Sequence, residues 1–201
     1  MPPMDNTISP LAPKPDVLDF LLKRRSRPPR SLGTDTPDDA TLRRILTAAL
    51  RVPDHGKLEP WRLIVLRRPA IERLISLTRT RGAERGLGTE RIERDINSYT
   101  DAHLIVAVVS SPKPSEKVPE PEQQASAAGV CLSLLNATLA SGWGAVWLTG
   151  WRATDRPYLS QGLELYPHET VAGYLHIGNE IRTPPERPRP DVDALTTWVE
   201  T

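Results

Sequence analysis

The order of helical and strand-like patterns is the feature that most limits what this chain can fold into. Helical spacing of apolar residues marks five segments, at residues 16–25, 36–50, 71–80, 89–99 and 122–139. Apolar, β-branched runs predict four strands, at residues 62–66, 103–110, 142–149 and 170–177. Helices and strands therefore mix without a regular strand–helix–strand alternation. This order favours the α+β class over a doubly wound parallel sheet.

Two of these segments carry more specific expectations. Thr36-Pro37-Asp38-Asp39 predicts a helix start, with Thr36 as the cap and proline at the first position. Residues 62–66 are continuously apolar after Arg62, which is typical of a buried strand. The 122–139 segment is rich in alanine, serine and glycine, so we expect a central helix that another element approaches closely.

Length and charge place limits on the class of protein. Residues 1–15 hold five prolines and little that could pack, so we expect a mobile N-terminal arm before one domain at 16–201. A net charge of +1 gives no reason to expect a nucleic-acid partner. The sequence shows neither a secretory signal nor an apolar run of roughly 18 to 20 residues, so we expect a cytoplasmic protein without membrane contact.

The sequence gives little reason to expect a metal site or a catalytic nucleophile. The single cysteine, Cys131, excludes an intramolecular disulfide and lies in an apolar helical stretch, where a core role is expected. The four histidines show no metal-binding spacing, and no Gly-x-Ser-x-Gly motif is present. We therefore predict no metal site and no catalytic triad.

Two polar segments are the first candidates for binding. The run Arg51-Val-Pro-Asp-His-Gly-Lys-Leu-Glu-Pro-Trp61 joins a helix to a strand and carries far more polar groups than a connector needs. Its His55 could act as a general base, a metal ligand or a recognition group. Arg24-Arg25-Ser26 closes the first helix with groups that suit an anion, although the same cations would also complement the helix dipole.

Four motifs occur together in a fixed order. They are Arg24-Arg25-Ser26, the run from Arg51 to His55 with Pro60-Trp61, the segment 117–127, and Ala140-Ser-Gly-Trp-Gly-Ala-Val-Trp-Leu-Thr-Gly150. In this order and spacing the chain resembles the nitroreductase family of FMN-dependent oxidoreductases, and within it the compact NAD(P)H nitroreductases. The resemblance spans most of residues 16–180.

The resemblance implies a fold and an assembly. The fold is α+β, with a mixed, mostly antiparallel central sheet flanked by helices. The assembly is a homodimer with two FMN molecules at its interface, each contacted by both subunits. A C-terminal segment reaches the partner, which would give the proline-rich residues 178–190 a surface to lie on.

The resemblance also implies the residues that hold the cofactor. Arg24, Arg25 and Ser26 correspond to the family's contacts to the phosphate and ribityl side of FMN. Arg51 and His55 correspond to contacts from the other subunit.

A second group of residues corresponds to the strand beside the flavin ring. Trp147, Leu148 and Thr149 are implied to line the isoalloxazine, and residues 137–142 match a stretch associated with NAD(P). No side chain is implied as an obligatory catalytic acid or base, because the cofactor carries the hydride chemistry.

The chain departs from the family pattern at several positions. Glu59 stands where the relatives carry glutamine, and Pro121 where they carry tryptophan. The cation expected near the flavin is either Arg27 or Arg30. A further pair, Arg187 and Arg189, is equally compatible with a phosphate contact and with a solvated tail.

The implied activity is a ping-pong transfer of hydride from NAD(P)H through FMN to an electron-poor small molecule, such as a nitroaromatic or a quinone. The main alternative is a flavin-binding or storage protein of the same fold with little turnover. A same-fold enzyme that consumes its flavin or dehalogenates a substrate is a further alternative. The sequence leaves open both the acceptor and the preference between NADH and NADPH.

Overall fold

The computed structural model describes residue 8 and residues 10–201. Residues 1–7 and 9 of the predicted N-terminal arm lie outside the described residues. In the described part, short 3₁₀ turns at Pro29–Ser31, His55–Lys57 and Trp151–Ala153 interrupt the connections. The helices and strands of the described part are α1 (Pro15–Lys23), α2 (Asp39–Ala49), β1 (Trp61–Arg67), α3 (Arg68–Glu84), α4 (Thr89–Thr100), β2 (Leu104–Ser110), α5 (Glu120–Ala140), β3 (Gly144–Leu148), α6 (Arg156–Leu163), β4 (Thr170–Gly178) and α7 (Val192–Leu195).

The strands form one sheet in the order β1-β2-β4-β3, and each of its three pairings is antiparallel. β2 is fully buried along its length and lies between β1 and β4. The register between β2 and β4 shifts between Val108 and Val109, so Ala172 of β4 lies opposite neither residue. The expectation of an α+β fold with a mostly antiparallel sheet is confirmed.

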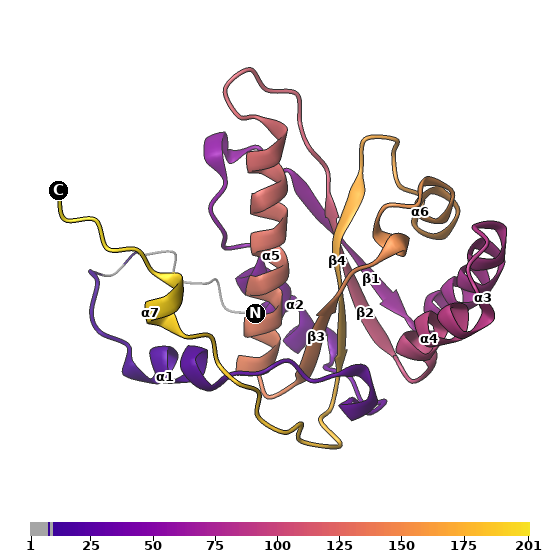
Figure 1. Ribbon diagram of the computed structural model, residues 1–201, viewed down its shortest axis with the longest axis horizontal. Helices are drawn as coiled ribbons and strands as arrows, with labels where there is room; N and C mark the ends of the chain where they lie inside the picture. Colours follow the sequence, from indigo (N-terminus) through magenta and orange to yellow (C-terminus); the bar gives the residue numbers. More distant parts are fainter. Residues whose placement is uncertain (1–7, 9) are drawn as a thin grey trace.

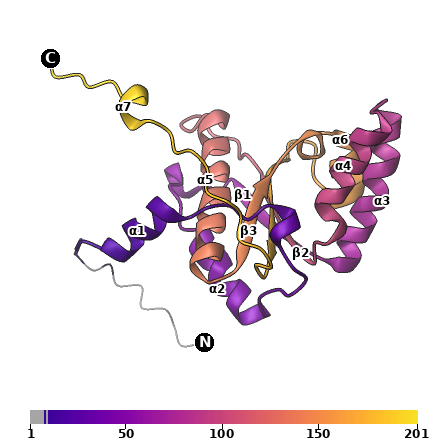
Figure 2. The ribbon, with the colours of Figure 1, turned by 60° about the horizontal axis from the view of Figure 1, so that its bottom comes forward.

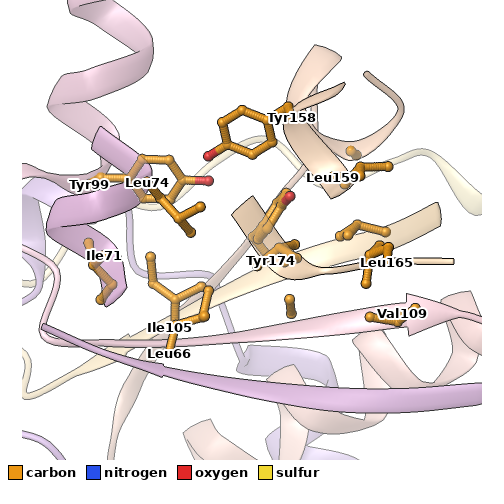
Figure 3. Close-up of a cluster of buried hydrophobic side chains, with 14 residues drawn as sticks. Leu66, Ile71, Leu74, Tyr99, Ile105, Val109, Tyr158, Leu159, Leu165 and Tyr174 are labelled. Atoms are coloured by element: carbon orange, nitrogen blue, oxygen red, sulfur yellow. The ribbon is translucent and has the colours of Figure 1, made fainter. Parts of the chain in front are cut away.

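Helices cover both faces of the sheet (Figure 1). One face packs against α2 and α5 through Leu104, Val106 and Val108 of β2. The other face packs against α3, α4 and α6 around the core shown in Figure 3, where Tyr99, Tyr158 and Tyr174 gather above the sheet. Alternate residues of β2 point to opposite faces, so one apolar strand supplies both cores.

The central helix lies where the sequence predicts it. α5 runs along the sheet and is the longest helix drawn in Figure 1. Its Cys131 is fully buried, and burial raises the pKa of the thiol to about 12. The expectation that Cys131 is a core residue rather than a nucleophile is confirmed.

Two local expectations are wrong. α2 is capped by Asp38, whose carboxylate accepts from the backbone N–H of Thr41 at 2.7 Å, and not by Thr36. A carboxylate is as good a cap as a hydroxyl, and here it lies one residue before the first helical turn. β1 is only partly buried, because it is the edge strand of the sheet and Val65 faces solvent.

The two ends of the described chain lie apart from these layers. α1 contains no buried residue, and the segment after Pro190 extends away from the sheet on the same side of the molecule in both views (Figures 1 and 2). Among the described residues, no helix combines the length and apolar character that a membrane span requires.

Candidate functional site

The first hollow, of about 550 Å³, lies beside the edge strand β3. Arg24, Arg25 and Ser26 line one side of it because α1 ends at Lys23 and the chain then turns along β3. The backbone N–H of Arg27 donates to the carbonyl of Ala145 at 2.8 Å, which fixes this segment against the strand. The remaining lining residues are Pro28, Pro29, Val146, Trp147, Leu148 and the C-terminal run 186–190.

Some arginine N–H groups at this hollow lack a hydrogen-bond acceptor in the part of the chain that the structure describes. Arg24 Nε and Arg25 Nη1 are both buried without a hydrogen-bond partner in the described residues. Burial, followed by the nearby charges of Arg189 and Arg27, lowers the pKa of Arg24 from its usual value. Buried donors of this kind are normally paired. The arrangement therefore fits an anion with several oxygen atoms, such as a phosphate.

The other arginines near the hollow differ in whether their N–H groups already have hydrogen-bond partners. Arg27 donates to Glu180 at 2.8 Å and to the carbonyl of Arg25 at 2.7 Å, so its guanidinium already has partners. Arg189 lines the hollow and donates to Glu186 at 3.0 Å. Arg187 also lines it, so the structure brings both C-terminal arginines to Arg24 and Arg25.

Arg30 points to a different place. It lines a small hollow of about 60 Å³ together with His176, and it is not among the lining residues of the first hollow. His176 is buried, its ring stacks on Tyr99 at 5.2 Å, and neither ring nitrogen has a partner among the described residues. Burial, and then the charge of Arg152, lower the pKa of His176 to about 3. This imidazole is therefore neutral at ordinary pH.

Trp147 is among the lining residues of the first hollow, but its indole ring packs against the core of the protein. Its indole N–H donates to the carbonyl of Ala172 at 3.2 Å, and the ring lies over Gly173, where a Cβ would come within 2.0 Å of Nε1. The ring thus packs toward α5. Leu148 is half-buried at the hollow, whereas Thr149 is exposed and is not among its lining residues.

The second hollow, of about 620 Å³, lies between the loop after α2 and the N-terminal half of α5. The loop is held by Asp54, whose carboxylate accepts from the backbone N–H groups of Leu58 at 3.1 Å and Glu59 at 2.9 Å. Lys57 and Glu59 have positive φ values of 53° and 47°, which is uncommon for residues with a Cβ. The loop therefore has a specific, slightly strained shape.

Two side chains of α5 hold the walls of this hollow in place. Ser126 accepts from the indole of Trp61 at 3.1 Å and donates to the carbonyl of Pro53 at 2.6 Å, which binds both ends of the loop to the helix. Gln123 is buried and bonds to both backbone groups of Lys113 and to the carbonyl of Val118. Gln123 thus holds the connection between β2 and α5 against the same helix.

His55 faces this second hollow. Its Nδ1 lies 2.8 Å from Oε1 of Glu122, which belongs to the first turn of α5, and both side chains are about half exposed. The sequence assigned no role to Glu122, because the two residues are 67 positions apart and spacing carries no signal for such a contact. Arg51 is exposed and does not line either hollow.

The predicted site residues thus fall into two groups within one chain, apart from Arg51 and Thr149, which line neither hollow. Five of them, Arg24, Arg25, Ser26, Trp147 and Leu148, line the first hollow. His55 lines the second, and the two hollows share no residue. Glu59 is exposed on the loop, and Pro121 lies in the first turn of α5 without lining the second hollow.

Comparisons with known proteins agree with one another. The profile described as "Nitroreductase family" matches residues 21–179. The chain is 29% identical over 163 residues to "Putative NAD(P)H nitroreductase YdjA" of Escherichia coli K12, covering 81% of this chain and 87% of that protein.

Solved structures show the same fold. The nitroreductase-like family protein from Bacillus cereus matches with a TM-score of 0.75 and 19% identity, covering 97% of this chain and all of that one. The FMN and NADPH-dependent nitroreductase NfnB from Sphigopyxis sp. strain HMH matches with a TM-score of 0.71 and 20% identity, covering 92% and 99% of the two chains.

Proposed function

Since this chain belongs to the nitroreductase family, we propose that it is an FMN-dependent NAD(P)H oxidoreductase. One observation carries the proposal beyond family membership. Arg24 and Arg25 have buried, unpartnered nitrogen atoms in a hollow beside β3, where an anionic group is needed to complete their bonding. The phosphate of FMN has the charge and the oxygen atoms to do this. Relatives named for FMN and NAD(P)H support the choice of cofactor and co-substrate.

Each residue of the first hollow would have a separate task. Arg24, Arg25 and Ser26 would bind the phosphate and the ribityl side, and Arg187 or Arg189 would add a further cation from the C-terminal run. Backbone at Trp147 and the side chain of Leu148 would lie against the flavin ring, with Thr149 at the strand end. Arg27, bonded to Glu180 and to the carbonyl of Arg25, would hold the segment that carries Arg25 and Ser26 in place.

FMN, when bound, would supply hydride chemistry between NAD(P)H and an electron-poor acceptor, with the two substrates using the same cavity in turn. The protein's part is to bind, orient and exclude water. We name no catalytic acid or base on this chain. A nitroaromatic or a quinone is the proposed class of acceptor, and the cytoplasm, where NAD(P)H is available, is the proposed location.

A homodimer would bring the two groups of predicted residues together. Arg51 and His55 do not reach the first hollow of their own chain, so we propose that they complete the site of a second copy. The apolar residues exposed on α1 and on the C-terminal segment support an assembly that covers them. These residues are Val17, Leu18, Leu21, Leu22, Val192, Leu195, Trp198 and Val199.

Spectroscopy tests the proposal directly. Purified protein should be yellow or should take up added FMN, and anaerobic NADH or NADPH should bleach the flavin absorbance. A chain that binds no FMN would contradict the proposal. A chain that binds FMN but is bleached by neither nucleotide would instead be a flavin-binding or storage protein.

Sedimentation velocity tests the assembly. The FMN-loaded protein is expected to sediment as a dimer, and truncation after Pro190 is expected to weaken that dimer because it removes exposed apolar side chains. A monomer that binds FMN with one molecule per chain would contradict the shared site while leaving the cofactor assignment intact.

A further inference from the structure

We infer that Glu122 is a positioning residue, which holds the imidazole of His55 with a proton on Nδ1, so that the uncharged form of the ring presents an unprotonated Nε2 to the second hollow. The inference rests on the proposed function, because the ligand that meets Nε2 is the bound flavin. It concerns an atom and an orientation that family membership alone does not specify.

The backbone that carries His55 is already fixed. Asp54, the preceding residue, ties down the loop through two backbone N–H groups, and Gly56, the following residue, has a φ of 73° that a Cβ would disfavour. Ser126 binds the loop to α5 at Pro53. Only the rotation of the imidazole and the position of its proton therefore remain to be set.

Glu122 sets both. It lies one helical turn before Ser126 on the same face of α5, so the helix that anchors the loop also delivers the carboxylate. An ionised carboxylate can only accept a hydrogen bond. The 2.8 Å contact with Nδ1 therefore requires a proton on Nδ1, which leaves Nε2 of the neutral ring as an acceptor. A carboxylate is also favourably placed in the first turn of a helix.

An acceptor at this position selects a donor on the ligand. The hollow that His55 enters is otherwise lined mainly by uncharged groups, among them Pro53, Pro60 and Val118. Oxidised FMN offers two kinds of donor, the N–H at ring position N3 and the hydroxyls of the ribityl chain. We assign Nε2 of His55 to one of these donors, across the proposed dimer interface.

Nitrogen-15 NMR tests the contact without any flavin. At alkaline pH, two-bond proton–nitrogen correlations of the full chain should show the His55 ring protonated on Nδ1, with the signal identified by its absence in His55→Gln. Glu122→Ala should move a large part of that population to the Nε2–H form. Glu122→Gln should retain the Nδ1–H form, because an amide oxygen still accepts. Glu120→Ala, in the same turn but bonded to Gln124, is the matched control and should change nothing.

Flavin affinity provides the second measurement. Loss of one net hydrogen bond should weaken FMN binding to Glu122→Ala about fivefold, with the glutamine variant close to wild type. FMN methylated at N3 identifies the donor. If N3–H meets His55, the methylated cofactor binds wild type weakly and Glu122→Ala has no added effect. If a ribityl hydroxyl does, Glu122→Ala weakens both cofactors alike.

The failure of this inference differs from the failure of the proposed function. A wild type that binds FMN, with Glu122→Ala unchanged in tautomer or in affinity, would overturn the positioning role alone. A wild type that binds no FMN would overturn the proposed function and with it the flavin partner of Nε2. In that case the tautomer measurement would still decide whether Glu122 orients His55.

Discussion

The arginines beside the edge strand β3 and those in the layer of α3, α4 and α6 differ in how they are paired. In the layer of α3, α4 and α6, Arg81 and Arg85 both donate to the buried carboxylate of Asp155, at 3.2 Å and 2.7 Å. Burial alone would raise the pKa of Asp155, but bonds from the two arginines and the backbone lower it. At the first hollow, Arg24 and Arg25 keep buried nitrogen atoms without partners.

This difference separates structural cations from binding cations. At the first hollow the nearby carboxylates, Glu186 and Glu180, are bonded to Arg189 and Arg27 and not to Arg24. The charges of Arg189 and Arg27 oppose that of Arg24. Stability is lost where like charges gather, and a bound anion restores it. The comparison therefore predicts that removing an arginine from the first hollow weakens ligand binding. Removing one from the layer of α3, α4 and α6 should instead lower the free energy of unfolding.

The largest expected effect concerns His176, which is buried and unpartnered but uncharged. Its pKa is about 3 in the folded chain, while the unfolded imidazole has a pKa near 6.5. As pH falls, the unfolded chain therefore binds a proton before the folded chain does. The contribution of this neutral imidazole to the free energy of unfolding is complete above pH 6.5 and is lost as pH falls toward 3. Urea denaturation from pH 7 to 3.5 should show a loss on the order of 4 kcal/mol from this group.

His176→Phe should keep the stacking on Tyr99 and remove that acid-dependent loss, so its stability should fall less steeply between pH 6.5 and 3. His168→Phe, at an exposed position stacked on Tyr166, is the matched control and should leave the slope unchanged. Equal slopes in wild type and His176→Phe would show that water or another group satisfies the buried ring.

The next effect belongs to the paired carboxylates. Arg62 donates twice to Glu169, at 2.8 Å each, and these bonds lower the pKa of Glu169 to about 2 although burial opposes the shift. The contribution of ionised Glu169 to the free energy of unfolding is complete above pH 4.5 and is lost as pH falls through 2. Glu169→Gln should cost about 3 kcal/mol at pH 7, measured by urea denaturation.

The same variant should leave FMN affinity unchanged, because Glu169 lies immediately before β4 and does not line the first hollow. Glu72→Gln, which removes an exposed pair with Arg68, should cost well under 1 kcal/mol. A Glu169 variant as stable as wild type at pH 7 would show that the pair of Arg62 and Glu169 contributes little to folding.

The third prediction concerns a substitution that should change FMN affinity and leave stability intact. Arg24→Gln should weaken FMN binding about 30-fold, as expected for a charge-assisted bond to phosphate, without lowering the stability of the flavin-free chain. Arg85→Gln is the matched control, because it removes a paired arginine and should lower stability while leaving FMN affinity intact. Fluorescence titration and thermal unfolding measure the two effects. If Arg24→Gln unfolds more easily and binds FMN normally, the distinction between binding arginines and structural arginines fails.

Much of the fold follows from local patterns. Fully apolar runs such as β2 and long small-residue helices such as α5 are determined by their own sequence, and both were predicted close to their observed ends. α6 was not predicted, because its eight residues contain a proline, a glycine and few apolar positions. The edge position of β1 also lay beyond the sequence, since strand order depends on the partners that a strand finds.

The candidate site was predictable to the extent that it follows from motifs. Arg24, Arg25 and Ser26 were identified as a continuous run, and the structure brings them to β3 as a group. For Arg187 and Arg189 the resemblance left two alternatives, a phosphate contact or a solvated tail, and the structure brings both residues to the first hollow. Two other long-range contacts, Glu122 with His55 and Glu180 with Arg27, were not predictable. Such contacts depend on tertiary geometry, which residue type and spacing do not encode locally.

The smallest predicted effect uses inorganic phosphate as a probe of the unpaired arginines. Tens of millimolar phosphate should raise the unfolding midpoint of the flavin-free chain by about 2 °C through weak binding at the first hollow. Phosphate also stabilises proteins generally by exclusion from their surface, so variants must separate the two causes. Arg85→Gln, with the hollow intact, should show the full rise, and Arg24→Gln only the general part. Equal rises in both variants would mean that Arg24 has no preference for phosphate, and that an unpaired arginine does not by itself mark a binding site.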